Sequence, residues 1–381
     1  MIPITKPNFG QEEIAAVEKV ILSGWVAQGP IVVEFENQFA KFVGAKYAAA
    51  TSNCTTALHL ALLAVGVKPG DYVLTVSHSF IATANAIRYC GAEPVFVDID
   101  LDTYNISADA LKKYLEKNKS RVAAILVVHQ MGMPCDLRSI LSLAKKFKLP
   151  VVEDAACAVG SEYSADKGKS WQKIGRPAGD IACFSFHPRK ILVTGEGGML
   201  TTNNANYDKQ FRLLRHQGMS VSDLQRHKAK KIIFEEYPQL GYNYRMTDIQ
   251  AALGIEQLKK LPAMIKRRRE LAKIYLKELR TISWLALPKE PKECKTNWQS
   301  FAVRVLGNAP LKRNQLMQHL LDQGIATRPG IMNAHEEKIY KDKKVSLTNS
   351  ELARNFVLIL PLFHQMTDPD IKRVIEVLKN V

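Results

Sequence analysis

Between about residues 46 and 204, short runs rich in apolar and β-branched residues alternate with segments whose apolar residues repeat at helical spacing. The expected strands are Lys46–Ser52, Tyr72–Val76, Pro94–Asp98, Val122–Val128, Val151–Glu153, Ile181–Phe186 and Met199–Thr202. The expected helices between the first five strands are Thr55–Val65, Ile81–Tyr89, Ala108–Glu116 and Leu137–Phe147. Strands that alternate with helices favour an α/β fold, in which a mostly parallel sheet carries helices on both faces.

The pattern changes after Thr247, where a long charged helical stretch, Ile249–Leu279, leads into a region of weaker strand–helix alternation. A chain of 381 residues is too long to fold around one small hydrophobic core. We therefore expect a large domain over residues 1–255 and a smaller C-terminal α+β domain over residues 256–381. In open α/β sheets, ligands bind beyond the carboxyl ends of the strands. We therefore expect the functional residues at those ends.

The chain carries 53 basic and 37 acidic residues, a net charge of +16. This excess favours anionic partners, which include nucleotides, phosphates, nucleic acids and acidic surfaces. Basic clusters such as Lys266–Arg269 are more typical of a solvated helix surface than of a binding site. Charge alone does not choose among the partners.

The six cysteines, Cys54, Cys90, Cys135, Cys157, Cys183 and Cys294, show no CxxC spacing. This distribution predicts a reduced, cytoplasmic protein without a disulfide framework or a zinc site. The histidines show no HExxH spacing, so no catalytic metal is expected. We expect neither export nor membrane insertion, because the sequence shows no signal pattern and no run of about 18 apolar residues.

One lysine, Lys190, lies between an apolar strand and a turn that contains Gly195, Gly197 and Gly198. Glycines permit the backbone to pass close to a bound ring. A lysine that leaves water loses part of its preference for the charged form, so its amine becomes a nucleophile and a proton carrier near neutral pH. Such a lysine can form a Schiff base with an aldehyde cofactor, although most lysines are surface charges.

Two further motifs follow strands. Asp154 emerges from an apolar run, where a carboxylate is costly unless it is paired, and a protonated ring nitrogen would be a suitable partner. An ordinary helix-capping aspartate is the alternative. Thr55 opens a helix after Ser52, Asn53 and Cys54, and a helix N-terminus binds phosphate readily. A simple Ser/Thr cap would explain the same residues.

Aromatic residues accompany two other candidate sites. Phe80 follows a strand, where it could stack on a cofactor ring or belong to the core. The segment Gly241–Arg245 is polar and aromatic, so Asn243 could bind phosphate and Arg245 an anion, or the segment could be a plain surface loop.

Taken together, six motifs resemble those of the DegT-type nucleotide-sugar aminotransferases, in the same order and at the same spacing. They are SNCTTALHLAL (52–62), HSFIATANAI (78–87), PVFVDID (94–100), VVEDAA (151–156), SFHPRK…TGEGGM (185–199) and GYNYRMTDIQAALG (241–254). The similarity extends from residues 23–30 to residues 360–367, nearly the whole chain. It implies the fold type I of aspartate aminotransferase with a mostly parallel seven-stranded sheet. It also implies bound pyridoxal 5′-phosphate (PLP), pyridoxamine 5′-phosphate as the intermediate form, and a homodimer whose active sites use both subunits.

By this resemblance, Lys190 is the Schiff-base lysine and Asp154 the partner of the pyridine nitrogen. The remaining cofactor contacts it implies are stacking by Phe80, phosphate binding by Thr55, Ser185 and the Cys54 amide, and a phosphate contact from Asn243 of the other subunit. The candidate substrate-binding residues are Trp25, His187, Arg245 and His335. The chain departs from the family at Cys157, where many members have Gln or His to contact the phenolic oxygen of the cofactor, and at Cys54, where many have Gly.

The resemblance implies transfer of an amino group from L-glutamate to a nucleotide-linked keto-sugar, with a 4-keto-6-deoxy hexose as the expected acceptor. The amino sugar would serve surface-glycan, lipopolysaccharide or O-antigen synthesis in the manner of a perosamine synthase. Some relatives carry histidine in place of the lysine and deoxygenate sugars, so the presence of Lys190 favours transamination. A PLP-dependent dehydratase, amination of another keto acceptor and, more distantly, a basic nucleic-acid-binding regulator remain alternatives, although we expect neither a nucleic acid nor a membrane as partner.

Overall fold

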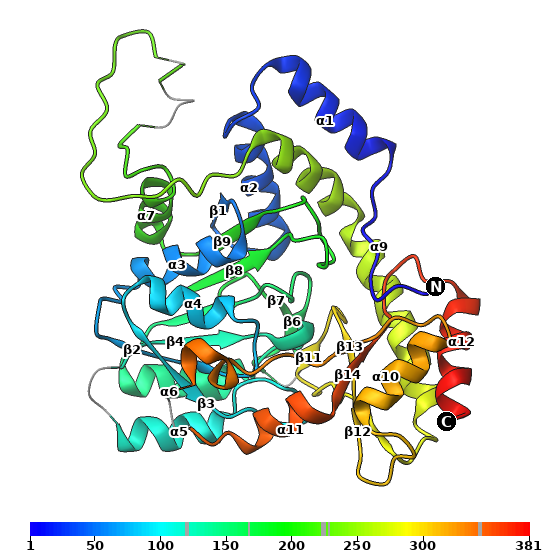
Figure 1. Cartoon of the computed structure of the whole chain (residues 1–381). Coiled ribbons are helices and arrows are strands. Elements are labelled where there is room, and N and C mark those ends of the chain that lie inside the picture. The colour runs from blue at the N-terminus through cyan, green and yellow to red at the C-terminus, as the bar shows by residue number, and fades with distance from the viewer. Residues whose placement is uncertain (119–121, 167, 222–225, 228, 342–344) are drawn as a thin grey trace.

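The computed structural model describes residues 1–118, 122–166, 168–221, 226–227, 229–341 and 345–381. Figure 1 shows a large sheet flanked by helices beside a smaller C-terminal unit. The α-helices are α1 (Gln11–Ser23), α2 (Pro30–Val43), α3 (Cys54–Ala64), α4 (Ala82–Tyr89), α5 (Ala108–Lys117), α6 (Leu137–Phe147), α7 (Ala205–Leu214), α9 (Asp248–Leu279), α10 (Arg313–Asp322), α11 (Thr348–Phe356) and α12 (Asp368–Lys379). The strands are β1 (Tyr47–Thr51), β2 (Tyr72–Val76), β3 (Glu93–Val97), β4 (Val122–Val128), β5 (Val151–Asp154), β6 (Glu162–Tyr163), β7 (Gln172–Lys173), β8 (Ile181–Ser185), β9 (Gly198–Thr202), β10 (Leu285–Ala286), β11 (Cys294–Lys295), β12 (Phe301–Val305), β13 (Arg328–Pro329) and β14 (Val357–Leu360).

The large sheet has seven strands in the order β1-β9-β8-β5-β4-β2-β3. The strands β3, β2, β4, β5 and β8 pair in parallel, whereas β9 runs antiparallel to both of its neighbours, β8 and β1. All seven predicted strands form, and each end lies within one residue of the expected position. The prediction of an α/β fold with a mostly parallel seven-stranded sheet is therefore confirmed.

The apolar runs that predicted these strands are buried on both faces of the sheet. On β4, Ile125 and Val127 belong to one hydrophobic cluster, and Ala124 and Leu126 belong to another on the opposite face. Helices α2, α5, α6 and part of α9 cover the first face, and α3, α4 and α7 cover the second. Full burial of an aliphatic side chain contributes about 1.5–3 kcal/mol, so a strand covered on both sides reads as a continuous apolar run.

Helix α9 links the two units of the molecule. Its residues from Ile255 to Ile265 pack in the first cluster, under the large sheet, whereas Leu271, Tyr275 and Leu279 pack in a separate cluster with β12, β14 and α12. The second unit is built on an antiparallel sheet of order β10-β12-β14-β13. The predicted boundary after residue 255 falls inside α9, and the division of domains at this residue stays a prediction.

The basic cluster Lys266–Arg269 lies within α9, and the expectation of a purely solvated surface is wrong for one of its members. Arg268 is buried, and its guanidinium donates hydrogen bonds to the backbone oxygens of Trp298 (2.9 Å) and Gln299 (2.7 Å). Burial lowers the pKa of Arg268 to about 9. This arginine therefore fastens α9 to the chain that enters β12, and it is not available to an anionic partner.

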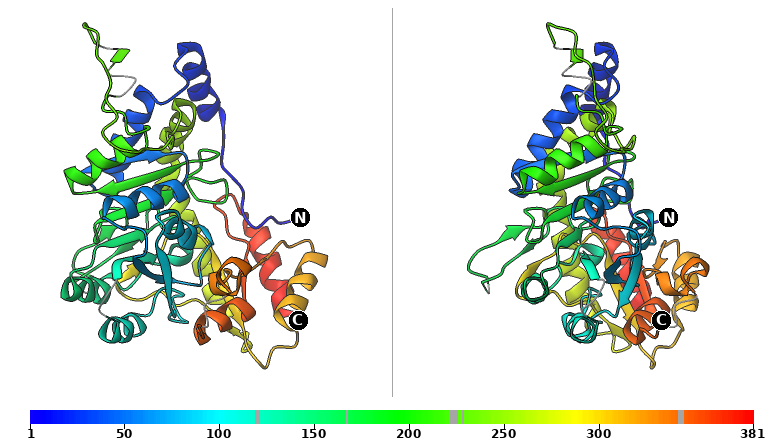
Figure 2. Two further views of the ribbon diagram at one scale, coloured as in Figure 1. Left: turned by 60° about the vertical axis from the view of Figure 1, so that its left-hand side comes forward. Right: turned by 90° about the vertical axis from the view of Figure 1, so that its left-hand side faces the viewer.

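Residues 229–241 extend away from the body of the molecule, as the views in Figures 1 and 2 agree. The side chains of Ile232, Phe234 and Leu240 are each more than four-fifths exposed. Their backbone is tied to the rest of the chain through Ser220, which exchanges hydrogen bonds with Glu236. Among the described residues, no helix is both long enough and apolar enough to cross a membrane.

Candidate active site

Strand ends from different parts of the chain meet at one edge of the large sheet. In the strand register, Thr51 of β1 and Ser185 of β8 both lie opposite Gly198 of β9. On the other side of β8, Cys183 lies opposite Asp154, the last residue of β5. Because β9 is antiparallel, its first residue lies at the edge where its neighbours end. Asp154, Ser185 and the start of α3 therefore lie at the same edge of the sheet, where the parallel strands end.

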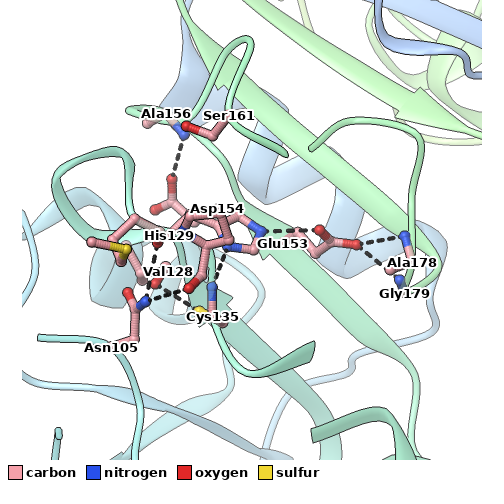
Figure 3. A network of polar contacts seen from close by, with 12 residues as sticks. Asn105, Val128, His129, Cys135, Glu153, Asp154, Ala156, Ser161, Ala178 and Gly179 are labelled. Carbon is pink, nitrogen blue, oxygen red and sulfur yellow. Dashed lines mark hydrogen bonds and ion pairs between the residues drawn. The ribbon is translucent and has the colours of Figure 1, made fainter. Parts of the chain in front are cut away.

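Asp154 is 5% exposed and lies at the end of β5. Its Oδ2 accepts a hydrogen bond from the Thr83 hydroxyl (2.8 Å), and its Oδ1 accepts one from the Ala156 N–H (3.1 Å, Figure 3). Burial raises the pKa of the Asp154 carboxyl, although these hydrogen bonds oppose the rise. Within the part of the chain that the structure describes, neither oxygen forms an ion pair, so a protonated ring nitrogen fits this carboxylate as a cationic partner.

Lys190 lies in the turn after β8, where its N–H donates to the His187 oxygen. Its Nζ donates a hydrogen bond to Cys157 Sγ at 3.0 Å. Burial lowers the pKa of Lys190, but Cys157, Cys54 and Asp154 outweigh burial and raise it above the ordinary value. Burial therefore acts on Lys190 as the sequence analysis expects, but the acidic groups beside the amine oppose its effect. A cationic group on Asp154 would remove one of the charges that hold the proton on Lys190.

The N-terminus of α3 lies directly beside Gly198. Asn53, not a serine or threonine, caps this helix by accepting a hydrogen bond from the Thr56 N–H (2.9 Å). A Cβ atom at position 198 would lie 2.4 Å from the Asn53 oxygen and 2.8 Å from the Cys54 nitrogen, so only glycine fits here. Thr55 is half-buried in the first turn, and among the described residues its hydroxyl has no hydrogen bond. The arrangement leaves Thr55 and the helix N-terminus available to a phosphate.

Phe80 and Asn243 are both exposed. Phe80 follows β2 with 66% of its surface accessible, so it is not a core residue in this chain. The Asn243 Oδ1 accepts a hydrogen bond from Arg245 Nε (3.1 Å). The loop that carries Asn243 lies near the start of α3, because the Ser52 N–H donates to the backbone oxygen of Tyr244 (2.9 Å).

The structure brings two of the predicted substrate-binding residues towards the sheet edge. His187 lies three residues before Lys190, and its Nδ1 accepts a hydrogen bond from the Arg189 N–H (3.2 Å). His335 comes from the C-terminal region, where its Nδ1 lies 2.6 Å from the Ser77 Oγ, just beyond β2. Trp25 instead donates to the Gln28 oxygen, and no contact joins it to Lys190 or Asp154 among the described residues.

Thr83 is the main site residue that the sequence analysis missed. It donates to Asp154, and its Oγ1 also lies 2.9 Å from the Ser79 Oγ. Thr83 and Asp154 are 71 positions apart, and no local pattern links two such residues. The one sequence feature that could have identified Thr83 as a site residue is the HSFIATANAI motif, in which Thr83 follows Phe80 by three residues.

A buried network holds β4 and β5 together behind Asp154 (Figure 3). The His129 Nδ1 accepts a hydrogen bond from the Cys135 N–H, so its proton lies on Nε2, which donates to Glu153 (2.9 Å). Glu153 also accepts two backbone N–H groups from the turn before β8. The backbone N–H of His129 in turn donates to the backbone oxygen of Asp154 (3.0 Å). With each buried polar group paired, this network fixes the backbone from which the Asp154 carboxylate projects.

Comparisons with known proteins show the family of the chain. The model of the DegT/DnrJ/EryC1/StrS aminotransferase family matches residues 7–379. The spore coat polysaccharide biosynthesis protein SpsC of Bacillus subtilis is 37% identical over 386 residues, which cover 100% of this chain and 97% of SpsC.

Solved structures show the same fold. The aminotransferase TlmJ from Streptoalloteichus hindustanus superposes with a TM-score of 0.89 at 34% identity, over 100% of this chain and 98% of that one. A sugar aminotransferase described as putative, Spr1654 from Streptococcus pneumoniae, has been solved in a PMP form and a PLP form. Both cover 100% of this chain and 98% of that chain at 26% identity, with TM-scores of 0.90 and 0.88.

The fold and the family match define a PLP-dependent aminotransferase. The chain belongs to the DegT/DnrJ/EryC1/StrS aminotransferase family.

Proposed function

We propose that the protein transfers the amino group of L-glutamate to a nucleotide-linked keto-sugar, a 4-keto-6-deoxy hexose, and so makes an amino sugar for a surface glycan such as the O-antigen of lipopolysaccharide. The family supports the reaction class, and the name of SpsC, which refers to spore coat polysaccharide biosynthesis, supports a glycan as the end use. The net charge of +16 suits a substrate that carries a diphosphate. We also propose a cytoplasmic location, which the free state of all six cysteines supports.

The observation that carries the proposal is the placement of the Lys190 amine and the Asp154 carboxylate at one sheet edge, close enough that each shifts the pKa of the other. Pyridoxal phosphate, when bound, supplies an aldehyde carbon that takes up the amino group and a ring that withdraws electrons. We assign to Lys190 the attachment of the cofactor and the movement of the proton, since its Nζ can take a proton from Cα of glutamate and later return one to the sugar carbon. The Asp154 carboxylate holds the proton of the ring nitrogen.

The proposed phosphate site, here called the cradle, is the space beside Gly198 at the N-terminus of α3. The Cys54 N–H and the hydroxyls of Thr55 and Ser185 bind the phosphate, which the partial positive charge of the α3 N-terminus favours. Phe80, whose exposed ring follows β2, stacks on the cofactor ring. Cys157 takes the position that faces the phenolic oxygen.

We further propose that the active protein is a homodimer in which Asn243 reaches the phosphate of the partner subunit. The exposed apolar side chains of residues 229–241 support a protein partner, because a monomer gains nothing by presenting them to water. Trp25, His187, Arg245 and His335 are proposed to contact the sugar nucleotide or the amino donor.

The first experiment reconstitutes the protein with PLP and follows its absorption spectrum before and after L-glutamate is added. The PLP spectrum should give way to that of the pyridoxamine form in the wild type, while Lys190→Ala should fail to turn over and keep its circular dichroism. The variant Lys209→Ala, which changes an exposed lysine of α7, is the matched control. Full activity in Lys190→Ala would refute the assignment.

A panel of nucleotide-linked keto-sugars and keto-cyclitols then tests the acceptor. Glutamate-dependent amination of a 4-keto-6-deoxy hexose is the expected result, and loss of a hydroxyl without amination would identify a dehydratase instead.

Mixing Lys190→Ala with Asn243→Ala subunits tests the shared site. If Asn243 acts across the interface, the mixed dimer regains activity that neither variant has alone. No recovery in a mixed dimer of proven composition would place Asn243 in its own subunit's site.

A further inference from the structure

The thiol of Cys157 has surroundings that no other cysteine of the chain shares. Cys157 is half-buried, whereas Cys54, Cys90, Cys135, Cys183 and Cys294 are buried. Burial raises the pKa of each of these five thiols, to about 12 for Cys90 and Cys294. Because the thiolate is the reactive form, the five buried cysteines are poor targets for oxidants and electrophiles.

Cys157 is held in direct contact with an amine. The Lys190 Nζ donates a hydrogen bond to the Cys157 Sγ at 3.0 Å. The backbone on the other side is fixed, because Asn297 Nδ2 donates to the backbone oxygens of Cys157 and Val159, each at 2.9 Å. The Cys157 backbone is therefore held in place, and the 3.0 Å contact between sulfur and nitrogen raises their effective concentration towards each other.

We propose that Cys157 and Lys190 together form a redox-sensitive modification site, at which a hydroperoxide joins the two side chains through a sulfur–nitrogen bond. The Cys157 thiolate attacks the peroxide, the O–O bond breaks, and sulfur is oxidised by two electrons to a sulfenic acid while an alcohol, or water from hydrogen peroxide, departs. The Lys190 nitrogen then attacks that sulfur, and the S–O bond breaks with loss of water. The ammonium of Lys190 supplies both protons that the two leaving groups need, so no further acid is required.

The site also depends on the cofactor, and this part rests on the role proposed above for Lys190. A lysine nitrogen attached to PLP cannot attack a sulfenic acid. The linkage should therefore form in the cofactor-free protein and in the pyridoxamine form, in which the amine is free, and should be blocked in the PLP form. Oxidation would then remove those molecules in which the lysine is free, and a thiol reductant would restore them by cleaving the S–N bond.

The test treats the reduced full-length protein with hydrogen peroxide, with and without prior loading with PLP, and maps its peptides by mass spectrometry without reduction. We expect a peptide pair that joins Cys157 to Lys190, lighter by two hydrogen atoms than the separate peptides and released by dithiothreitol. Cys157 should also be alkylated by iodoacetamide at least about tenfold faster than any of the other five cysteines. The pair should be absent from Cys157→Ser and present in Cys90→Ser, the matched control at a buried cysteine.

Cys54 is the nearest competing explanation, because a disulfide between Cys54 and Cys157 would cause the same loss of mass. The variant Cys54→Ala separates the two, since the linkage to Lys190 persists in it and a disulfide cannot form. A cross-link to Cys54, or no modification of Cys157 at all, would overturn the proposal. A Cys157–Lys190 linkage that forms equally in the presence of PLP would leave the redox site standing and refute the cofactor role of Lys190.

Discussion

The close contact between Gly198 and the start of α3 predicts that Gly198→Ala weakens PLP binding. A Cβ atom at this position would lie 2.4 Å from the Asn53 oxygen, whereas ordinary contact begins at 3.4 Å. The two backbones must separate by about 1 Å, and the shift falls on the Cys54 N–H that we assign to the phosphate. Loss of a hydrogen bond to a charged group such as a phosphate costs about 1.5–3 kcal/mol. We therefore expect the Kd for PLP to rise about a hundredfold, or about 2.8 kcal/mol.

Equilibrium dialysis with PLP measures this change directly. Overpacking also costs about 1–3 kcal/mol of folding free energy, so urea unfolding of the cofactor-free variant must first show that it is folded under the assay conditions. The matched control is Gly307→Ala, because a Cβ at position 307 would meet nothing within 4 Å. If Gly198→Ala is folded and binds PLP within about twofold of the wild type, the phosphate does not lie in this cradle.

Two further predictions concern Asp154. Because burial raises its pKa, the ionised carboxylate destabilises the cofactor-free fold as the pH rises above the ordinary value of 3.8. Asp154→Asn should therefore stabilise the cofactor-free protein towards urea at pH 7. The same variant should slow transamination at least about a hundredfold. A variant that loses stability, or that keeps its rate, would contradict this account. Thr83→Val removes a hydrogen bond that lowers the same pKa, so the acid limb of the pH–kcat profile should move to higher pH, and an unmoved limb would remove Thr83 from the mechanism.

The sequence was sufficient for elements that are defined locally and for motifs at their ends. Buried strands such as β4 and β5 were readable because apolar residues fill both of their faces. The strand order was not readable, because the reversal of β9 depends on pairing with β1, about 150 positions earlier. The rise in the Lys190 pKa was not readable from the sequence for a related reason. Burial of a lysine follows from its neighbours in sequence, but the opposing effect of Cys157 comes from a contact across 33 positions.

The residues assigned to the amino group and those assigned to the sugar depend on different parts of the fold. Asp154, Ser185 and Gly198 are set by the register of the large sheet, so their relative positions are as rigid as the core on its two faces. His335 instead reaches the edge from the C-terminal region through its contact with Ser77. Under the proposed assignment, substitutions near His335 should change which sugar is accepted without moving the groups that hold the cofactor.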